Sequence, residues 1–500
     1  MKSTFSPGCS ALRRAVMIAL CAGLSACAVG PDYVPPVVDV GEGYKEAAVD
    51  TSGWTPAQPR DDHARGEWWR IYQDGTLDGL MTQLNIANQN VAQAEANYRQ
   101  ALALVRNARS DLFPLITTGA GLSRSGSGSG TSGSGSTTSS GGGPSNQYTA
   151  SGTVSWEPDV WGRVRRNIES QQANVQASVS DLATARLSAQ SALAQNYFQL
   201  RILDEQARLL AQTVAAYERS LKLTSNRYDA GLSARADIAV ATTQLESTRA
   251  QAIDLEWQRA QFEHAIAVLI GVPPSRFTLV ASDFGQAVPQ IPAGLPSALL
   301  ERRPDVAAAE RRMAQANAQI GVAKAAWFPN LTLSADGGFR SGQFAEWLTA
   351  PARFWSLGPQ LAATIFDGGL RASQVEQAEA SYDGQVAAYR QTVLSALGEV
   401  EDYLGQMRVF EREQVVQNRA LDSSRESLRL TRNQYESGLI DYLSVATIQA
   451  TALSNERTAL NLIGNRLTAS VQLIAALGGG WDGVEQAMRD AQPAVDAAKR

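Results

Sequence analysis

The feature that most constrains this chain is a sequence unit that occurs twice. The stretch LKLTSNRYDAGL, which contains Gly231, aligns with LRLTRNQYESGL, which contains Gly438, at an offset of 438 − 231 = 207 residues. The same offset places AVLIG, which ends at Gly271, onto IAALG, which ends at Gly478. Repetition at this period predicts that one structural unit of about two hundred residues is built twice.

Each repeat predicts the same order of elements: a helix, two strands, a very long helix, a tight glycine turn and a return helix. In the first repeat (76–271) the expected elements are a helix at 77–110, strands at about 115–123 and 147–156, a long helix at 162–230 and a return helix at 235–270. In the second repeat (297–478) they are an opening helix, strands at about 331–340 and 355–366, a long helix at 369–437 and a return helix at 441–477. The first long helix has no internal Gly or Pro and should measure about 100 Å.

The strand segments alternate in polarity and predict a sheet with one apolar and one polar face. In NQYTASGTVSW, for example, Tyr148, Val154 and Trp156 share a face. Aromatic residues cluster at the strand ends, as they do in membrane barrels. In lipid such a sheet must close on itself, and strands from two or three chains would supply eight or twelve. A pair of soluble hairpins packed on the helices is the alternative.

The first 26 residues have the pattern of a secretory signal peptide. Basic residues precede an apolar run at 15–24 that is too short to span a bilayer, and small residues lead up to Cys27. The motif LSAC resembles the lipobox of bacterial lipoproteins, which implies acylation of Cys27, with palmitate as one chain, and a lipidated linker over residues 27–75. Because Ala28 rather than Asp follows, the outer membrane is the expected destination. An ordinary secretory signal that happens to include a cysteine is the alternative.

Composition argues against several other classes of protein. The chain has 44 Lys and Arg against 49 Asp and Glu, so no basic excess points to nucleic acid. Its two histidines, His63 and His264, are far apart and neither has a second ligand at helical spacing, so no metal site is expected. All three cysteines lie in the first 27 residues. Without a phosphate loop or a nucleophile–base pair, we expect no enzyme and no cofactor beyond the covalent lipid on Cys27.

Four motifs, spread over nearly the whole mature chain, resemble those of TolC/OprM-type outer-membrane factors, in the lipoprotein branch used by tripartite efflux systems. They are CAVGPDYVPP after the signal, WWRIYQDGTLDGLMTQLNIANQNVAQAEANYRQA at the first helix, LLERRPDVAAAERRMAQANAQIGVAKAAWFP at the second repeat, and IFDGG before its long helix. The resemblance implies a homotrimer with a twelve-stranded outer-membrane β-barrel, four strands per chain, continued by a long periplasmic α-helical barrel. An equatorial belt would take the segment 272–296 and the periplasmic C-terminal tail 479–500.

The resemblance also implies a function. Such proteins are passive exit ducts in the bacterial outer membrane for drugs or other solutes. They receive these solutes from a periplasmic adaptor (membrane fusion) protein and an inner-membrane transporter, often of the resistance-nodulation-division class. The sequence does not specify the substrate, the adaptor or the pump. A lipoprotein that serves as a structural or adhesive stalk is the alternative from another class, although a stalk needs no lipid-facing strands.

The turns between the long and the return helices are the expected periplasmic gate. In the family this tip carries a YLDVLDAQ-like run; Asp237 and Leu443 take matching positions here, whereas Ser444 and Thr447 stand where the family often has Asp. Our hypothesis is that Asp237 and Asp441 form rings of negative charge at the closed tip. The expected latch partners are Arg227, Arg235 and Tyr442, and the expected adaptor contacts are Gly231 and Gly438. Solvated charges in a polar turn are the alternative.

Overall fold

The computed structural model describes residues 28–36, 43–46, 67–126, 144–285, 287–289, 291 and 303–479. The signal peptide, Cys27, His63, most of the expected linker and the tail from residue 480 onward lie outside the described residues. The chain forms two compact units, and each draws on both repeats. Unit 1 comprises Met1–Pro36, Gln100–Val175 and Arg311–Ala387, and unit 2 comprises Val37–Arg99, Gln176–Glu310 and Ala388–Arg500.

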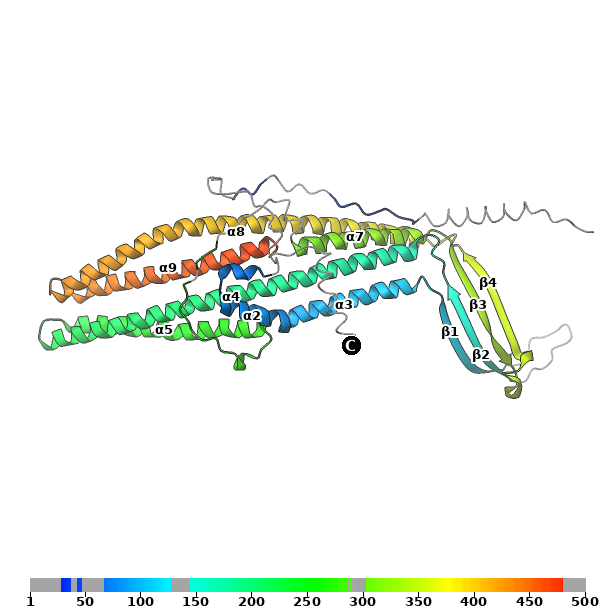
Figure 1. Ribbon diagram of the computed structural model, residues 1–500, viewed down its shortest axis with the longest axis horizontal. Coiled ribbons are helices and arrows are strands. Elements are labelled where there is room, and N and C mark those ends of the chain that lie inside the picture. The colour runs from blue at the N-terminus through cyan, green and yellow to red at the C-terminus, as the bar shows by residue number, and fades with distance from the viewer. Residues whose placement is uncertain are drawn as a thin grey trace, which may run out of the picture. The chain divides into compact units, whose positions relative to one another are not determined.

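The described elements confirm a mainly helical chain with four strands (Figure 1). The first repeat contains η1 (Trp68–Tyr72), α2 (Gly75–Ala87), α3 (Gln89–Ser110), β1 (Leu115–Ser125), β2 (Ser145–Trp156), α4 (Arg163–Asp229) and α5 (Arg235–Leu269). The connecting segment contains η2 (Pro274–Arg276). The second repeat contains α7 (Pro304–Ala325), β3 (Asn330–Ser341), η3 (Phe344–Glu346), η4 (Ala350–Ala352), β4 (Arg353–Ala362), α8 (Leu370–Glu436) and α9 (Tyr442–Ala476).

The long helices α4 and α8 each contain 67 residues, and the return helices α5 and α9 each contain 35. Each long helix is therefore about 100 Å long. Two residues beyond the end of each long helix lies a glycine in the left-handed region, Gly231 at φ +74° and Gly438 at φ +79°. In each turn the residue after the glycine donates its N–H back to the helix, Leu232 to Arg227 O and Leu439 to Gln434 O. This C-terminal motif favours glycine because a side chain would be strained there.

The helix expected at 77–110 is interrupted, which corrects the sequence prediction. Asn88 lies between α2 and α3 in extended conformation, at ψ 122°. Its Oδ1 accepts hydrogen bonds from Asn90 N and Val91 N, both at 3.0 Å, so Asn88 caps the start of α3. Its Nδ2 donates to Leu269 O at the end of α5, at 2.7 Å. The cap and this distant carbonyl together favour a break over one continuous helix.

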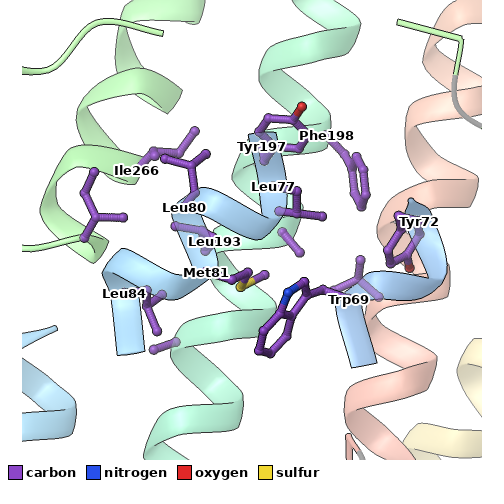
Figure 2. Packing of buried hydrophobic residues seen from close by; sticks show 14 of the residues in the cluster. Trp69, Tyr72, Leu77, Leu80, Met81, Leu84, Leu193, Tyr197, Phe198 and Ile266 are labelled. Atoms are coloured by element: carbon purple, nitrogen blue, oxygen red, sulfur yellow. The ribbon is translucent and has the colours of Figure 1, made fainter. Parts of the chain in front are cut away.

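The core of unit 2 lies where η1 and α2 pack against α4 and the return helices (Figure 2). Leu77, Met81 and Leu84 of α2 have no exposed surface. Full burial of such a side chain contributes about 1.5–3 kcal/mol. Tyr72 of η1 packs its ring on Phe198 of α4, with centroids 4.7 Å apart. The last part of the expected linker, which contains η1, is therefore structural and not a loose connection.

Charged side chains on α4 and α5, buried or half-buried, hold the described start of the segment that connects the two repeats. Arg201 donates to Val280 O at 2.8 Å, and Leu279 N donates to Glu263 at 2.6 Å. Phe284 N donates to Glu205 at 2.9 Å. These contacts satisfy backbone groups of the segment, whose described residues form no strand and no long helix.

Unit 1 contains an antiparallel sheet in the order β1-β2-β3-β4 (Figure 1). The strands lie close to the expected ranges, except that β4 ends at Ala362 and not near Phe366. The chain leaves the sheet there because Asp367 caps the start of α8, accepting from Gly369 N at 3.0 Å. Arg371, paired with Asp367, also donates to Thr364 O at 2.8 Å. Thr364 thus contacts the helix start and not a neighbouring strand.

Candidate functional site

The two faces of the sheet differ sharply in chemistry. The row Ile116, Val154, Ala335 and Leu357 crosses all four strands on one face. Of these, Ile116 is 72% and Leu357 is 75% exposed, and Trp355 on the same face is 82% exposed. A contiguous apolar face of this kind is unusual on a surface in water and suits contact with lipid.

The opposite face is lined mostly by small and polar residues. The row Thr117, Thr153, Asp336 and Ser356 crosses the four strands there. Thr153 Oγ1 donates to Asp336 Oδ1 at 2.6 Å, a hydrogen bond between neighbouring strands. The alternation seen in the sequence therefore places a water-compatible surface opposite the apolar one.

The outer strands β1 and β4 each pair with one neighbour in the described part of the chain. Every residue of β1 is exposed. Their outer edges thus present backbone N–H and C=O groups that a membrane could not solvate. A lipid-facing sheet with two such edges needs strands from another molecule to be complete.

The segment after Cys27 lies against α4 and α7 within unit 1. Arg166, whose side chain is 6% exposed, donates to Val29 O at 3.2 Å, to Gly30 O at 3.3 Å and to Asp32 at 2.8 Å. Val29 N donates to Trp161 O at 3.1 Å. Cys27 itself lies outside the described residues, so these contacts fix only the chain that follows it.

The two predicted gate acids act as local helix caps. Asp237 is half-buried and accepts from Ser233 Oγ at 2.7 Å and from Ala234 N at 3.1 Å. Asp441 is exposed, is the N-cap of α9, and accepts from Ser444 N at 3.1 Å and Ser444 Oγ at 2.6 Å. The Ser444 hydrogen bonds lower the pKa of the Asp441 carboxyl. Ser444 thus stabilises the ionised carboxylate of Asp441.

Arg227 joins the turn of the first repeat to the turn of the second. It donates to Tyr435 O at 2.7 Å, and its guanidinium carbon lies 4.8 Å from the centroid of the Tyr435 ring. The Tyr435 hydroxyl lies 3.0 Å from Thr224 Oγ1 on α4. Sequence reasoning singled out Arg227 but missed Thr224 and Tyr435, since no local pattern shows which side chains meet between repeats.

The remaining residues of the predicted tip divide into buried and exposed. Tyr442 is fully buried, packs edge-on against Tyr435 with centroids 5.5 Å apart, and burial raises its pKa to about 12. It therefore belongs to the core of the turn and not to its surface. Arg235 and Leu443 are exposed. Next to Gly231 and Gly438, Leu232 and Leu439 are 71% and 76% exposed, and sequence reasoning did not single out either.

Neither a metal centre nor a membrane-spanning helix is found in the described parts of the chain. No group of three or more His, Cys, Asp or Glu that could hold an ion occurs among the described residues. None of the described helices is both long and apolar enough to cross a bilayer.

Comparisons with known proteins agree with this geometry. The profile of the family described as "Outer membrane efflux protein" matches residues 80–272 and 295–479. The chain is 29% identical over 490 residues to the toluene efflux pump outer membrane protein TtgF of Pseudomonas putida, covering 95% of this chain and 98% of TtgF. It is 30% identical over 423 residues to the pyoverdine export outer membrane protein OpmQ of Pseudomonas aeruginosa, covering 84% and 89% of the two chains. The solved structure of the outer-membrane channel OprN superposes with a TM-score of 0.80 at 30% identity, covering 91% of this chain and 100% of OprN.

Proposed function

This chain belongs to the outer membrane efflux protein family, and from that premise we propose that three copies of it close one channel through the outer membrane. The observation that carries this proposal is the four-stranded sheet with an exposed apolar face and two unpaired edges among the described residues. Two chains would supply eight strands, and side chains fill the interior of an eight-stranded barrel. Three chains supply twelve strands, which leave an open lumen. The polar face then lines the lumen and the apolar face contacts lipid.

The long helices would continue this channel into the periplasm as a helical barrel. The glycine turns that end α4 and α8 would form its inner end, with Asp237 and Asp441 repeated threefold as rings of negative charge. Both side chains are already oriented by the helix-capping hydrogen bonds that they accept. The link from Arg227 to Tyr435 would hold the two turns of each chain together in the closed state.

The partners we propose are a periplasmic adaptor and an inner-membrane transporter of the resistance-nodulation-division class, which would supply the energy. Leu232 and Leu439, exposed beside Gly231 and Gly438, form a small apolar surface at each turn suited to the adaptor. The related proteins TtgF and OpmQ are named for the efflux of toluene and the export of pyoverdine, which are two different compounds. We therefore propose that the duct accepts chemically varied solutes and that its pump selects them.

We also propose that Cys27 carries covalent lipid, which would anchor the N-terminus in the inner leaflet of the outer membrane. The contacts of Arg166 with Val29, Gly30 and Asp32 support this proposal, since they hold the following residues against unit 1, which contains the sheet. No catalytic role is proposed for any residue.

The proposal is tested on the purified, lipidated protein in one detergent. Its oligomer mass is measured in that detergent, and its conductance is measured after insertion into planar bilayers. We expect a trimer whose current increases when Arg227 or either gate acid is replaced by Ala. A monomer that never conducts would contradict the channel and favour the structural stalk. Dye efflux in a strain that lacks its own channel provides the matching test in cells.

A further inference from the structure

The polar face of the sheet carries very few charges. Among the polar-face positions of the four described strands, Asp336 and Arg340 are the only charged residues and Phe354 is the only aromatic one. All other positions there are Ser, Thr, Gly, Asn, Gln, Leu or Ala. Any ionic preference of the channel within the sheet should therefore depend on these few side chains.

Arg340 and Phe354 meet near the end of the sheet that is farthest along the strands from the helices. Arg340 is the next-to-last residue of β3 and Phe354 the second residue of β4. The guanidinium carbon of Arg340 lies 4.6 Å from the centroid of the Phe354 ring. The strand partner of Phe354 is Gly338, where an added Cβ would lie 2.0 Å from Ala150 O. Because Gly338 has no side chain, Arg340 can reach the ring diagonally.

Asp336 lies farther toward the helices and has a different environment. It is four residues before Arg340 on β3, about 13 Å along the strand. It accepts a hydrogen bond from Thr153 on the neighbouring strand and is partly shielded. The two charges are thus separated along the face and do not neutralise each other by direct contact.

We propose that Arg340, held over Phe354, is the residue that determines charge selectivity at the outer mouth of the channel and that it favours anionic solutes. This inference rests on the proposed function, which turns the polar face inward and repeats each position three times. Three guanidiniums then encircle the exit, each beside an aromatic ring. Asp336 forms a separate ring of opposite charge deeper in the barrel.

The expected size of the effect follows from Coulomb's law. In water, an anion that passes about 7 Å from one guanidinium is favoured by about threefold, since the interaction energy there is close to RT. The Debye length is about 10 Å at 0.1 M salt, so the measurement should use this concentration or less. Neutralising Arg340 should therefore lower the chloride-to-potassium permeability ratio by about threefold or more.

The test is the reversal potential of single trimers in a potassium chloride gradient. Arg340→Gln should lower the chloride-to-potassium ratio, and Arg340→Lys should restore it because the charge returns. The control is Arg353→Gln, which removes an exposed arginine at the same end of the sheet on the apolar face, where Arg353 pairs with Phe339. This control should leave the ratio unchanged.

The outcomes separate this inference from the proposed function. If Arg340→Gln forms trimers of normal conductance with the wild-type permeability ratio, the inference about Arg340 is overturned, whereas the proposed channel function is unaffected. An equal shift in Arg353→Gln would also overturn it, because the effect would then depend on overall charge. Chains that stay monomeric, or trimers that carry no current even with Arg227→Ala, would remove the proposed function and this inference together.

Discussion

Replacing Arg227 with Ala should loosen the link between the two turns of each chain. The substitution removes a charge-assisted hydrogen bond to Tyr435 O at 2.7 Å and the contact with the Tyr435 ring at 4.8 Å. Hydrogen bonds to charged groups contribute about 1.5–3 kcal/mol, and Arg227 is half-buried, so the low end applies. The ring contact adds about 0.5 kcal/mol at such a site. The closed state of the tip should therefore be destabilised by about 2 kcal/mol per chain. This corresponds to a change of about 30-fold in the equilibrium constant between closed and open turns.

The assay for this prediction is the fraction of time that single trimers conduct at a fixed voltage. Arg219→Ala is the control, because Arg219 is an exposed arginine on the same helix. A double-mutant cycle with Tyr435→Leu isolates the ring contact, since the Tyr435 carbonyl is retained. If Arg227→Ala and Arg219→Ala conduct for the same fraction of time as the wild type, the proposed latch is refuted.

Three further substitutions test separate parts of the structure. Asn88→Ala should destabilise unit 2 by about 2 kcal/mol in urea unfolding, because both a helix cap and the bond to Leu269 O are lost, whereas Asn88→Ser should retain the cap. Asp441→Ala should lower the melting temperature at pH 7, because the folded-state pKa of Asp441 is lowered and its carboxylate therefore stabilises the fold above the unfolded pKa of about 3.9. The difference in melting temperature between wild type and variant should vanish as the pH falls through the folded pKa. Arg166→Ala should accelerate hydrogen exchange at Val29 N by about 30-fold, and equal protection in both proteins would contradict the docking of this segment.

Sequence patterns predicted the helices and strands because the responsible signals are local. The long helix α4 contains neither Gly nor Pro, and Gly231 marks its end. The break at Asn88 was missed because the amide of Asn88 also binds Leu269 O, 181 residues away. The early end of β4 was missed for a similar reason, since the capping contacts of Asp367 compete with strand pairing.

The candidate site was predicted in part. Repetition located both glycine turns and their acids, but the composition of a turn does not show which side chains are buried. Tyr442 therefore seemed equivalent to its exposed neighbours, although it packs inside the turn against Tyr435. The contact between Arg340 and Phe354 depends on strand register across β3 and β4, which the alternation within one strand leaves undetermined.

The equal lengths of the paired helices restrict how this gene can change. Both long helices have 67 residues and both return helices have 35. One inserted residue moves everything beyond it by about 1.5 Å and turns it by about 100° about the helix axis. An insertion in α4 alone would therefore shift the turn of the first repeat relative to the turn of the second. It would also rotate the packed face of α4 beyond the insertion away from the neighbouring helices. Tolerated insertions or deletions should occur in steps of about 7 or 11 residues, which restore the face, and should be matched in all four helices.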